Sequence, residues 1–431
     1  MTTISTTIRA GRHWHLVGRV RVLAVLAAII VAISLTSGAA LAEPKPTPDP
    51  VNYLSKDVRT KMEAQQPLTT AASLIQWSVE RGNSTGYAGI GLGVDEVVVW
   101  WKGALPPAVG DAVADARRTA SVRMAAAAHS RAELEAAAKG IANYVRVHPR
   151  SPYHRVDIAY DGSGLVVNTD PDQMLPVSLP ADMKVPAGIR VSIAKRERLQ
   201  LAGPGNYLKY LLASRMDDFA PYWGGGRIIN TDYGGGCTAG FPVTAGGAQY
   251  MLTAGHCGRP GAVWTNGVGT RYFGTGAYEN VEHDVLLISA NVGGRIWDGG
   301  VGSGEFSKGV ADWGWVFPGE WLCTSGSVTG ALCGHIVSND FTFMNCATDG
   351  YGNNECYYDL ILAYRLDGET AVRPGDSGGP VFGLSGSDRV IAKGTITGSG
   401  NVTELVFQDF ATAWRDSCNT PALGCITPVT G

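Results

Sequence analysis

The cysteines of this 431-residue chain are confined to its C-terminal half. All eight lie at or after Cys237, and the preceding 236 residues contain none. Disulfides limit how far segments of a chain can separate, and they persist in oxidising compartments outside the cytosol. The distribution therefore predicts at least two domains of different construction, a cysteine-free domain followed by one held together by disulfides. The length also favours two or three domains.

The N-terminus is typical of a secretory signal peptide. Four arginines precede an uncharged stretch from Val22 to Ala42, which ends in the small-residue sequence Ala-Leu-Ala. A basic start, an apolar segment and such a cleavage site together indicate export. The alternative is an uncleaved membrane anchor, because a stretch of this length could span a bilayer. The strongly apolar part ends near Leu35, so we expect residues 1–42 to be removed and the protein to be secreted into the extracellular medium.

The region after the signal peptide divides into a linker and a mixed domain. Residues 43–52 contain PKPTPDP, which is a stiff, extended linker. Within residues 53–216, Val97–Trp101 reads as a strand, and Ser130–Glu133 fits a capping box ahead of an alanine-rich helix. A turn at Asp161–Gly162 joins two apolar runs into a hairpin. These patterns predict a small α/β domain, which by pattern alone is either a propeptide or a permanent domain.

The remainder of the chain, residues 217–431, reads as all-β. Glycine is abundant, 57 of 431 residues, and separates short β-prone runs such as Leu360–Tyr364 with turn signals every ten or so residues. A helix is expected only near the end, around Gln408–Arg415. This half holds 10 Lys and Arg against 21 Asp and Glu. Binding to phosphates requires clustered basic residues, so nucleic-acid partners are excluded.

Three short segments of the second half contain the groups that amide hydrolysis requires. TAGHC carries His256, EHDVLL carries Asp284 before an apolar strand, and PGDSGGP carries Ser377 in a glycine-rich turn. Peptide hydrolysis needs a nucleophile, a base, a group that orients the base, and donors for the oxyanion. We predict that Ser377 attacks, His256 moves the proton and Asp284 orients the ring. The backbone N–H groups of Gly375 and Ser377 would face the oxyanion.

Each segment also has an ordinary structural interpretation. A histidine beside a cysteine, an aspartate before a strand and a glycine-rich loop are common features of folds. Their order and spacing, 28 and then 93 residues apart, make coincidence a weak explanation. Residues 375–379 also match the G-x-S-x-G elbow of α/β-hydrolases, but that fold needs a histidine after the serine. The last histidine here is His335, which precedes Ser377 and is interpreted as a core or surface residue. His283 is predicted to be structural, because alternation along a strand would point it away from Asp284.

The three motifs resemble those of chymotrypsin-like serine peptidases, and in detail the bacterial α-lytic endopeptidase and streptogrisin branch. The segment Cys323–Gly330, closing at Cys333, is similar to the SG-T-TG disulfide loop of that branch. The resemblance covers Gly224–Ala413 and implies two six-stranded antiparallel β-barrels with the triad in the cleft between them. It also implies a preproenzyme, so residues 53–216 are interpreted as an α/β propeptide that assists folding, and residues 217–431 as the peptidase domain.

The cysteines are expected to form four disulfides. The resemblance implies the first two pairs, whereas the last two rest on proximity in the sequence. Zinc is the alternative, but no C-x-x-C pair exists and export favours oxidation, so no metal and no other cofactor are predicted. The expected pairs are Cys237 with Cys257, Cys323 with Cys333, Cys346 with Cys356, and Cys418 with Cys425.

Two features of the family pattern leave questions open. The branch often has an arginine that pairs with the buried aspartate before the nucleophile, but Thr324 stands at that position, so the partner of Asp376 is not identified. Neither the predicted substrate-binding segment nor Glu369–Ala371 clearly places an acidic residue at the bottom of the primary pocket. We therefore expect this pocket to take apolar or small side chains. By resemblance, the residues that bind the substrate backbone are Thr397, Gly398 and Ser399.

Together these observations predict a secreted serine endopeptidase that acts through an acyl-enzyme. Its partners would be polypeptide substrates, its own propeptide and protein protease inhibitors, and it would be monomeric after maturation. The mature chain is expected to start between Asp217 and Gly226, with cleavage at Arg227–Ile228 as a second choice. The alternatives are a catalytically silent binding protein on the same fold and a membrane-anchored surface hydrolase.

Overall fold

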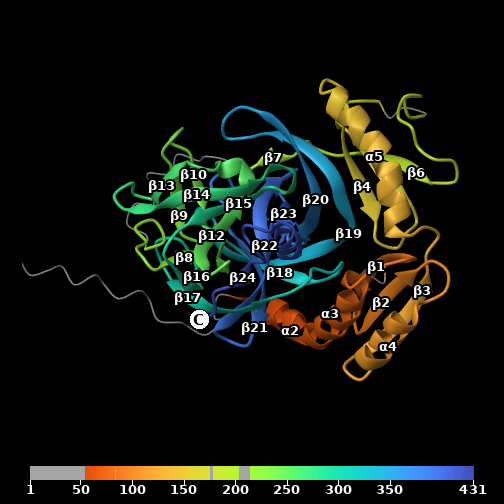
Figure 1. Cartoon of the computed structure of the whole chain (residues 1–431), viewed down its shortest axis with the longest axis horizontal. Helices are drawn as coiled ribbons and strands as arrows, with labels where there is room; N and C mark the ends of the chain where they lie inside the picture. The colour runs from red at the N-terminus through yellow and green to blue at the C-terminus, as the bar shows by residue number, and fades with distance from the viewer. Residues whose placement is uncertain (1–53, 83, 175–177, 203–213) are drawn as a thin grey trace, which may run out of the picture. The chain divides into compact units, whose positions relative to one another are not determined.

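The computed structural model describes residues 54–82, 84–174, 178–202 and 214–431 (Figure 1). The predicted signal peptide and linker lie outside these residues. Among the helices of the described part of the chain, none combines the length and apolar character that crossing a bilayer requires.

The first lobe of the N-terminal region is a three-stranded sheet covered by helices. Strand β2 pairs antiparallel with β1 and parallel with β3, and it contains the predicted strand at Val97–Trp101. The apolar face of helix α3, including Ala72 and Ile75, packs into the core under this sheet. The elements are α2 (Lys56–Ala64), α3 (Gln66–Glu80), β1 (Tyr87–Leu92), β2 (Glu96–Trp101), α4 (Pro107–Ala116) and β3 (Ser121–Ala126).

The second lobe contains the predicted capping box and hairpin. The Ser130 hydroxyl accepts from the Glu133 amide and the Glu133 carboxylate accepts from the Ser130 amide, so both free amides at the helix start are satisfied. The turn after β4 uses Gly162 at φ 75°, which favours glycine. The elements are α5 (Arg131–Val147), β4 (Tyr153–Ala159), β5 (Leu165–Thr169), β6 (Val191–Lys195) and β7 (Gln200–Leu201).

The C-terminal region begins with an eight-stranded sheet in the order β10-β9-β13-β14-β15-β12-β11-β24. Its buried face includes Trp264, Leu286 and Ile288, which form one apolar cluster. The strands are β9 (Arg227–Asn230), β10 (Gly236–Thr238), β11 (Phe241–Ala245), β12 (Ala248–Ala254), β13 (Val263–Asn266), β14 (Tyr272–Asn280), β15 (Val285–Ser289) and β24 (Thr427–Pro428).

A thirteen-stranded sheet runs through both halves of the chain. Strand β4 pairs antiparallel with β19, placing Ile158 opposite Phe341, so the second lobe and the C-terminal region share one sheet (Figure 1). Strand β7 adds to β22. The strands that the C-terminal region contributes to this sheet are β8 (Tyr222–Gly224), β16 (Val292–Gly299), β17 (Glu305–Trp313), β18 (Trp321–Gly326), β19 (Gly330–Thr348), β20 (Asn354–Arg365), β21 (Pro380–Ser385), β22 (Arg389–Ser399) and β23 (Glu404–Asp409).

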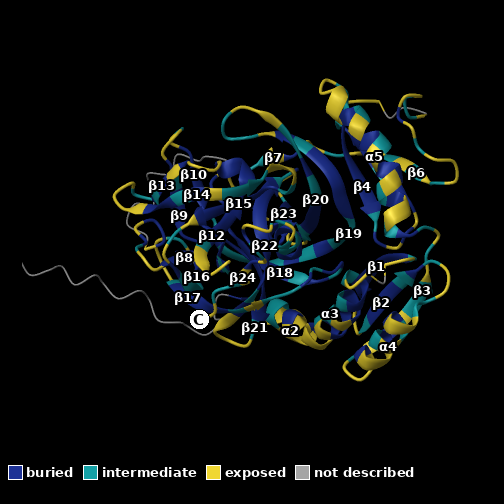
Figure 2. Cartoon of the chain, viewed as in Figure 1, coloured by how far each residue is buried: buried dark blue, intermediate teal, exposed yellow. Residues whose placement is uncertain are grey.

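The C-terminal region is mostly β, as predicted, and several of its strands, such as β21 and β23, are buried almost throughout (Figure 2). The expected late helix is α6 (Phe410–Cys418), which starts two residues later than predicted because Asp409 caps it by accepting from Thr412. Two 3-10 turns, η2 (Gly255–Cys257) and η3 (Val281–His283), are additional. The eight cysteines form the four pairs expected from the sequence.

Candidate active site

Three turns bring the predicted catalytic side chains together. His256 lies in η2, directly after β12, and Asp284 follows η3 immediately before β15. Because β12 and β15 are antiparallel neighbours with Ala254 opposite Val285, the two turns meet at one end of the sheet. Ser377 lies in the turn before β21 of the other sheet. The site is therefore assembled where the two sheets face each other.

The three side chains form a continuous chain of hydrogen bonds. His256 Nδ1 lies 2.9 Å from Asp284 Oδ1, and His256 Nε2 lies 2.6 Å from Ser377 Oγ. The Asp284 oxygen also accepts from the His256 backbone N–H at 2.9 Å, which holds the ring in place. All three residues are buried. The ring can therefore accept a proton from the hydroxyl through Nε2 while the carboxylate stabilises the imidazolium through Nδ1.

Asp284 has an unusual backbone for an aspartate. Its φ is 50°, in the left-handed region that few residues other than glycine, asparagine and aspartate adopt. The turn lets the chain leave η3 and enter β15 while the carboxylate points back to His256. A strained residue held by its surroundings is common at functional sites.

The partner of Asp376 is the backbone and not an arginine. Its carboxylate accepts the N–H groups of Val328 at 2.9 Å, Thr329 at 3.1 Å and Arg373 at 2.8 Å. Burial raises the pKa of this carboxyl, and the three amides act in the opposite direction. A Cβ on Gly326 would lie 2.0 Å from Asp376 Oδ1, so the loop needs glycine there. The carboxylate thus links the SG-T-TG loop to the turn that carries the nucleophile.

Strand β7 of the N-terminal region pairs antiparallel with β22, which contains the predicted substrate-binding residues. Gly398 pairs with Leu201 and Ser399 pairs with Gln200. The Ala202 N–H donates to the carbonyl oxygen of Thr397 at 3.2 Å. All three residues predicted to bind the substrate backbone are therefore engaged by a segment of the same chain.

The carbonyl oxygen of Ala202 accepts a hydrogen bond from the backbone N–H of Gly375, one of the two predicted oxyanion donors. The second predicted donor, Ser377, follows two residues later in the same turn. Residues 199–202 were not predicted to lie at the site. The available signal was only the alternation of Leu199 and Leu201 ahead of a small residue.

Two other histidines lie near charged or polar groups. His283 lies in η3 and not in a strand, so the alternation used to orient it does not apply. Its Nδ1 lies 2.9 Å from Asp416, and this partner raises the pKa of His283 against the opposing effect of burial. His335 is fully buried in β19, where burial lowers its pKa to about 3, so it is a neutral core residue.

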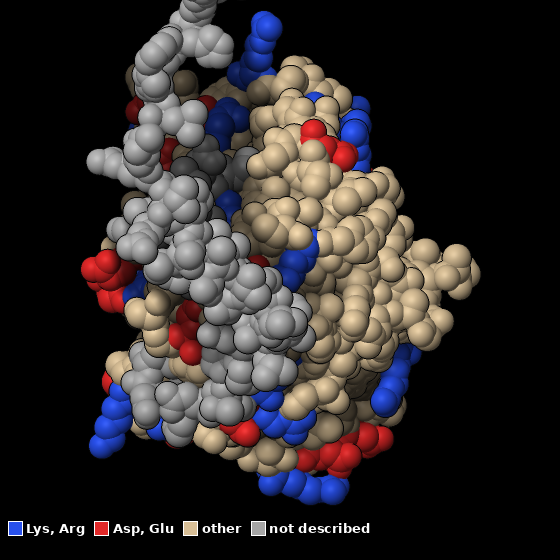
Figure 3. Space-filling view, turned by 90° about the vertical axis from the view of Figure 1, so that its left-hand side faces the viewer, with Lys and Arg blue, Asp and Glu red and all other residues tan. Residues whose placement is uncertain are grey.

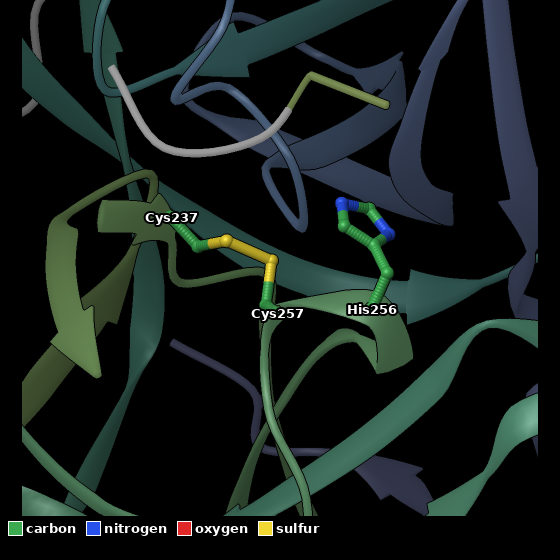
Figure 4. Close-up of side chains that lie close together, drawn as sticks. All are labelled: Cys237, His256 and Cys257. Carbon is green, nitrogen blue, oxygen red and sulfur yellow. A yellow bond between two sulfur atoms is a disulfide. The ribbon is translucent and has the colours of Figure 1, made fainter. Parts of the chain in front are cut away.

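One histidine and two cysteines lie close enough together to resemble a metal site. Ligand atoms of Cys237, His256 and Cys257 all lie within 4.8 Å of one another (Figure 4). The two sulfur atoms are joined in a disulfide of 1.97 Å, so neither is a thiolate ligand. The histidine is already hydrogen-bonded to serine and aspartate. This group does not suit a metal ion.

Charges around the described surface are mixed. On the described residues of the face in Figure 3, Lys and Arg side chains are scattered, and several lie beside Asp or Glu. Glu369, which the sequence analysis weighed as a pocket acid, is exposed. Its backbone N–H donates to Asp367 at 3.1 Å, which places it in a surface turn.

Comparisons with known proteins find similarity to bacterial serine proteases. Streptogrisin-A of Streptomyces griseus is 32% identical over 194 residues, covering 44% of this chain and 59% of that protein. Serine protease 2 of Streptomyces fradiae is 33% identical over 165 residues, covering 37% of this chain and 86% of that protein. A solved structure, Thermobifida fusca Protease A, is 22% identical, with 48% of this chain and 98% of that chain covered and a TM-score of 0.36. No family model matches the chain.

A mostly β fold with hydrogen-bonded serine, histidine and aspartate defines the class of chymotrypsin-like serine peptidases. Within that class the chain belongs to the streptogrisin-type family, because it is similar to most of the length of Serine protease 2. It spans 59% of the length of streptogrisin-A.

Proposed function

We propose that the protein is a serine endopeptidase that hydrolyses polypeptides through an acyl-enzyme. The observation that carries this proposal is the relay in which His256 Nε2 lies 2.6 Å from Ser377 Oγ and Nδ1 lies 2.9 Å from Asp284. Both distances are hydrogen-bond distances, and the shorter one allows proton transfer from the Ser377 hydroxyl to His256. Membership of the streptogrisin-type family supports the same activity.

In the proposed reaction, the Ser377 oxygen attacks the substrate carbonyl carbon and gives its proton to His256. The backbone N–H groups of Gly375 and Ser377 stabilise the oxyanion, a contribution of about 3 kcal/mol for one donor. His256 then protonates the leaving amine, and Asp284 stabilises the imidazolium in the meantime. A water molecule then gives a proton to His256 and attacks the ester carbon, and His256 returns that proton to the Ser377 oxygen as the carboxylic acid product is released.

The N-terminal region, residues 53–216 of the predicted organisation, is proposed to be a removable propeptide that assists folding. Arg155 of β4 donates to Glu404 of β23 at 2.9 Å, and both side chains are 1% exposed. Trp77 of α3 contacts three tryptophans of the C-terminal region edge-on. Strands that are far apart in the sequence pair slowly during folding. A folded N-terminal region would offer these strands a surface to pack on and so speed their pairing.

We further propose that the C-terminal region corresponds to the two six-stranded barrels of the family, secreted and monomeric after maturation. Protein protease inhibitors would bind the same cleft as substrates. This region would be stable mainly because it unfolds slowly, which suits a protease outside the cell.

Fluorophosphonate labelling of the secreted, matured protein tests the activity. We expect the probe to attach at Ser377, and the Ser377→Ala chain to remain unlabelled. Ser385→Ala, a substitution in the neighbouring strand β21, is the matched control and should label normally. Absence of labelling in the unaltered, folded protein would favour a catalytically silent binding protein. The mass of the secreted product tests whether the N-terminal segment was removed or retained as an anchor.

A further inference from the structure

We propose that His283 is a positioning residue of the active site. Its ring ties the turn that carries Asp284 to helix α6, which follows the sheet of the nucleophile, and so keeps the aspartate and histidine of the site in line with the serine. The inference rests on the proposed peptidase activity and adds a residue outside the triad on which the rate of the chemical step depends.

The catalytic side chains are supplied by two separate sheets. His256 and Asp284 lie on turns of the eight-stranded sheet, whereas Ser377 lies in the turn before β21 of the thirteen-stranded sheet. The 2.6 Å contact between His256 Nε2 and Ser377 Oγ therefore crosses from one sheet to the other. A displacement of about 1 Å between reacting groups can lower a rate about 100-fold. Contacts that fix the two sheets relative to each other near the site therefore affect the rate.

The turn that carries Asp284 has little stability of its own. Turn η3 comprises three residues, Val281–His283, and its closing hydrogen bond from the Asp284 N–H to the Val281 carbonyl oxygen is long, at 3.3 Å. Short 3-10 segments have poor hydrogen-bond geometry. Asp284 itself has a φ of 50°, a conformation that persists only where the surroundings enforce it. The position of the catalytic carboxylate therefore depends on contacts that the turn makes with other elements.

The ring of His283 makes such contacts with elements of the other sheet. Its Nδ1 lies 2.9 Å from each carboxylate oxygen of Asp416 in α6, and its Nε2 lies 3.9 Å from Asp359 Oδ2 in β20. Helix α6 directly follows β23, which pairs with β22, and β22 pairs with β21, which begins just after Ser377. The ring therefore connects the turn of Asp284 to the sheet that positions the nucleophile.

Helix α6 provides a firm anchor for this connection. Asp409 caps its first turn, and the disulfide between Cys418 and Cys425 ties its end to the following segment. The side chains of His283 and Asp416 are 22% and 11% exposed, so the ion pair between them is partly buried. A partly buried pair is screened less by salt than an exposed one. The pair can therefore hold the turn in place at physiological ionic strength.

The connection is strongest when the His283 ring carries a proton. Burial lowers the pKa of His283, but the hydrogen bond and charge of Asp416 outweigh burial and raise it, with help from the charges of two further aspartates, Asp359 and Asp409. Asp359 also faces Arg131 of helix α5, at 3.9 Å between the two side chains. A group with a raised folded-state pKa contributes stability that is lost as the pH rises through that pKa. The turn should therefore be held firmly below the pKa of His283 and loosen above it.

The first test compares two substitutions around this turn in the mature enzyme. Asp416→Asn keeps the shape of the partner and removes its charge. Glu282→Gln is the matched control, because Glu282 lies in the same turn, is exposed, and its carboxylate has no hydrogen bond or ion pair with another described residue. We expect Asp416→Asn to lower kcat on a peptide coumarin amide about tenfold, with KM changed by less than about twofold. Glu282→Gln should leave both constants unchanged.

Fluorophosphonate labelling separates this inference from the proposed activity. Labelling uses the same attack by Ser377, so its rate should also fall about tenfold in Asp416→Asn. Equal labelling rates in the unaltered enzyme and Asp416→Asn, or a loss confined to KM, would overturn the role of His283 and leave the activity standing. An unaltered enzyme that neither labels nor cleaves would overturn both.

The second test follows kcat against pH, a readout that simple packing of the ring would not change. In the unaltered enzyme kcat should fall at alkaline pH as His283 loses its proton, and in Asp416→Asn this fall should begin at least about 1 pH unit lower. His283→Lys keeps a cation beside Asp416, so it should lose the alkaline fall up to about pH 9 and cleave faster than His283→Gln. Equal rates in His283→Lys and His283→Gln would show that the charge has no role and would overturn the proposal. Absence of an alkaline fall in the unaltered, folded enzyme would overturn it without any variant.

Discussion

Replacing Gly398 with alanine should weaken substrate binding while leaving the fold intact. Gly398 pairs with Leu201 of β7, and a Cβ built on it would lie 2.1 Å from the carbonyl oxygen of Gln200. Non-bonded heavy atoms are in favourable contact at about 3.5 Å, so the paired strand would have to move away by about 1.4 Å. Neither the Cβ nor the Gln200 carbonyl oxygen moves when a side chain rotates, so side-chain rotation cannot relieve this contact.

The expected loss follows from the hydrogen bonds that such a retreat disrupts. The bond from the Ala202 N–H to Thr397 is already 3.2 Å long and would not survive the shift, and the adjacent pairing at Gly398 would weaken. Two backbone hydrogen bonds contribute about 0.5–1.5 kcal/mol each. The total of about 1–3 kcal/mol corresponds to a decrease of about 5- to 150-fold in kcat/KM on an extended peptide.

The assay compares Gly398→Ala with a matched glycine substitution. Gly383 lies in the adjacent strand β21, and a Cβ there would meet Lys393 Cε at 3.5 Å, an ordinary contact. Gly383→Ala should therefore keep both its thermal unfolding temperature and its kcat/KM. The peptide for this assay is a coumarin amide of acetyl-Leu-Gln-Leu-Ala, the sequence of residues 199–202. Cleavage by Gly398→Ala at the rate of the unaltered enzyme, or equal loss of activity in both variants, would contradict this prediction.

Two further predictions concern stability. Arg155→Ala, made in the uncleavable Ser377→Ala chain, should lower the free energy of unfolding by about 3–5 kcal/mol, because it leaves buried carboxylates without their cation. Arg198→Ala removes an exposed ion pair and should cost less than about 1 kcal/mol by the same urea titration. Burial, reinforced by Glu355, raises the pKa of Glu279 from 4.5 to about 7. A raised folded-state pKa means that stability falls as the pH rises from 4.5 through 7, so Glu279→Gln should raise the unfolding temperature at pH 8 and leave it unchanged at pH 4. An equal gain at both pH values would contradict this assignment.

The features predicted well from the sequence are those encoded by neighbouring residues. The capping box at Ser130 and the hairpin at Gly162 depend on contacts within a few positions, and both formed as expected. The four disulfides also join cysteines at most 20 residues apart. The convergence of His256, Asp284 and Ser377 is not local, and its prediction came from the chemical groups, order and spacing of three short segments.

The features missed are contacts between segments far apart in the chain. The partner of Asp376 proved to be a set of backbone amides, which carry no side-chain signature in a sequence. The placement of His283 was reasoned from strand alternation, which a 3-10 turn does not obey. The pairing of β4 with β19 and of β7 with β22 joins residues nearly 200 positions apart.

The sequence by itself determined the division between a cysteine-free and a cysteine-containing region and the chemical groups of the site. It also predicts an export signal. Only the tertiary structure showed which segment of the chain pairs with β22. Whether Ala202 or another residue meets the Gly375 amide depends on backbone hydrogen bonding, which any residue can provide. That choice is made by the burial of Leu199 and Leu201 against a wall drawn from distant strands, and such burial exists only once the whole chain has folded.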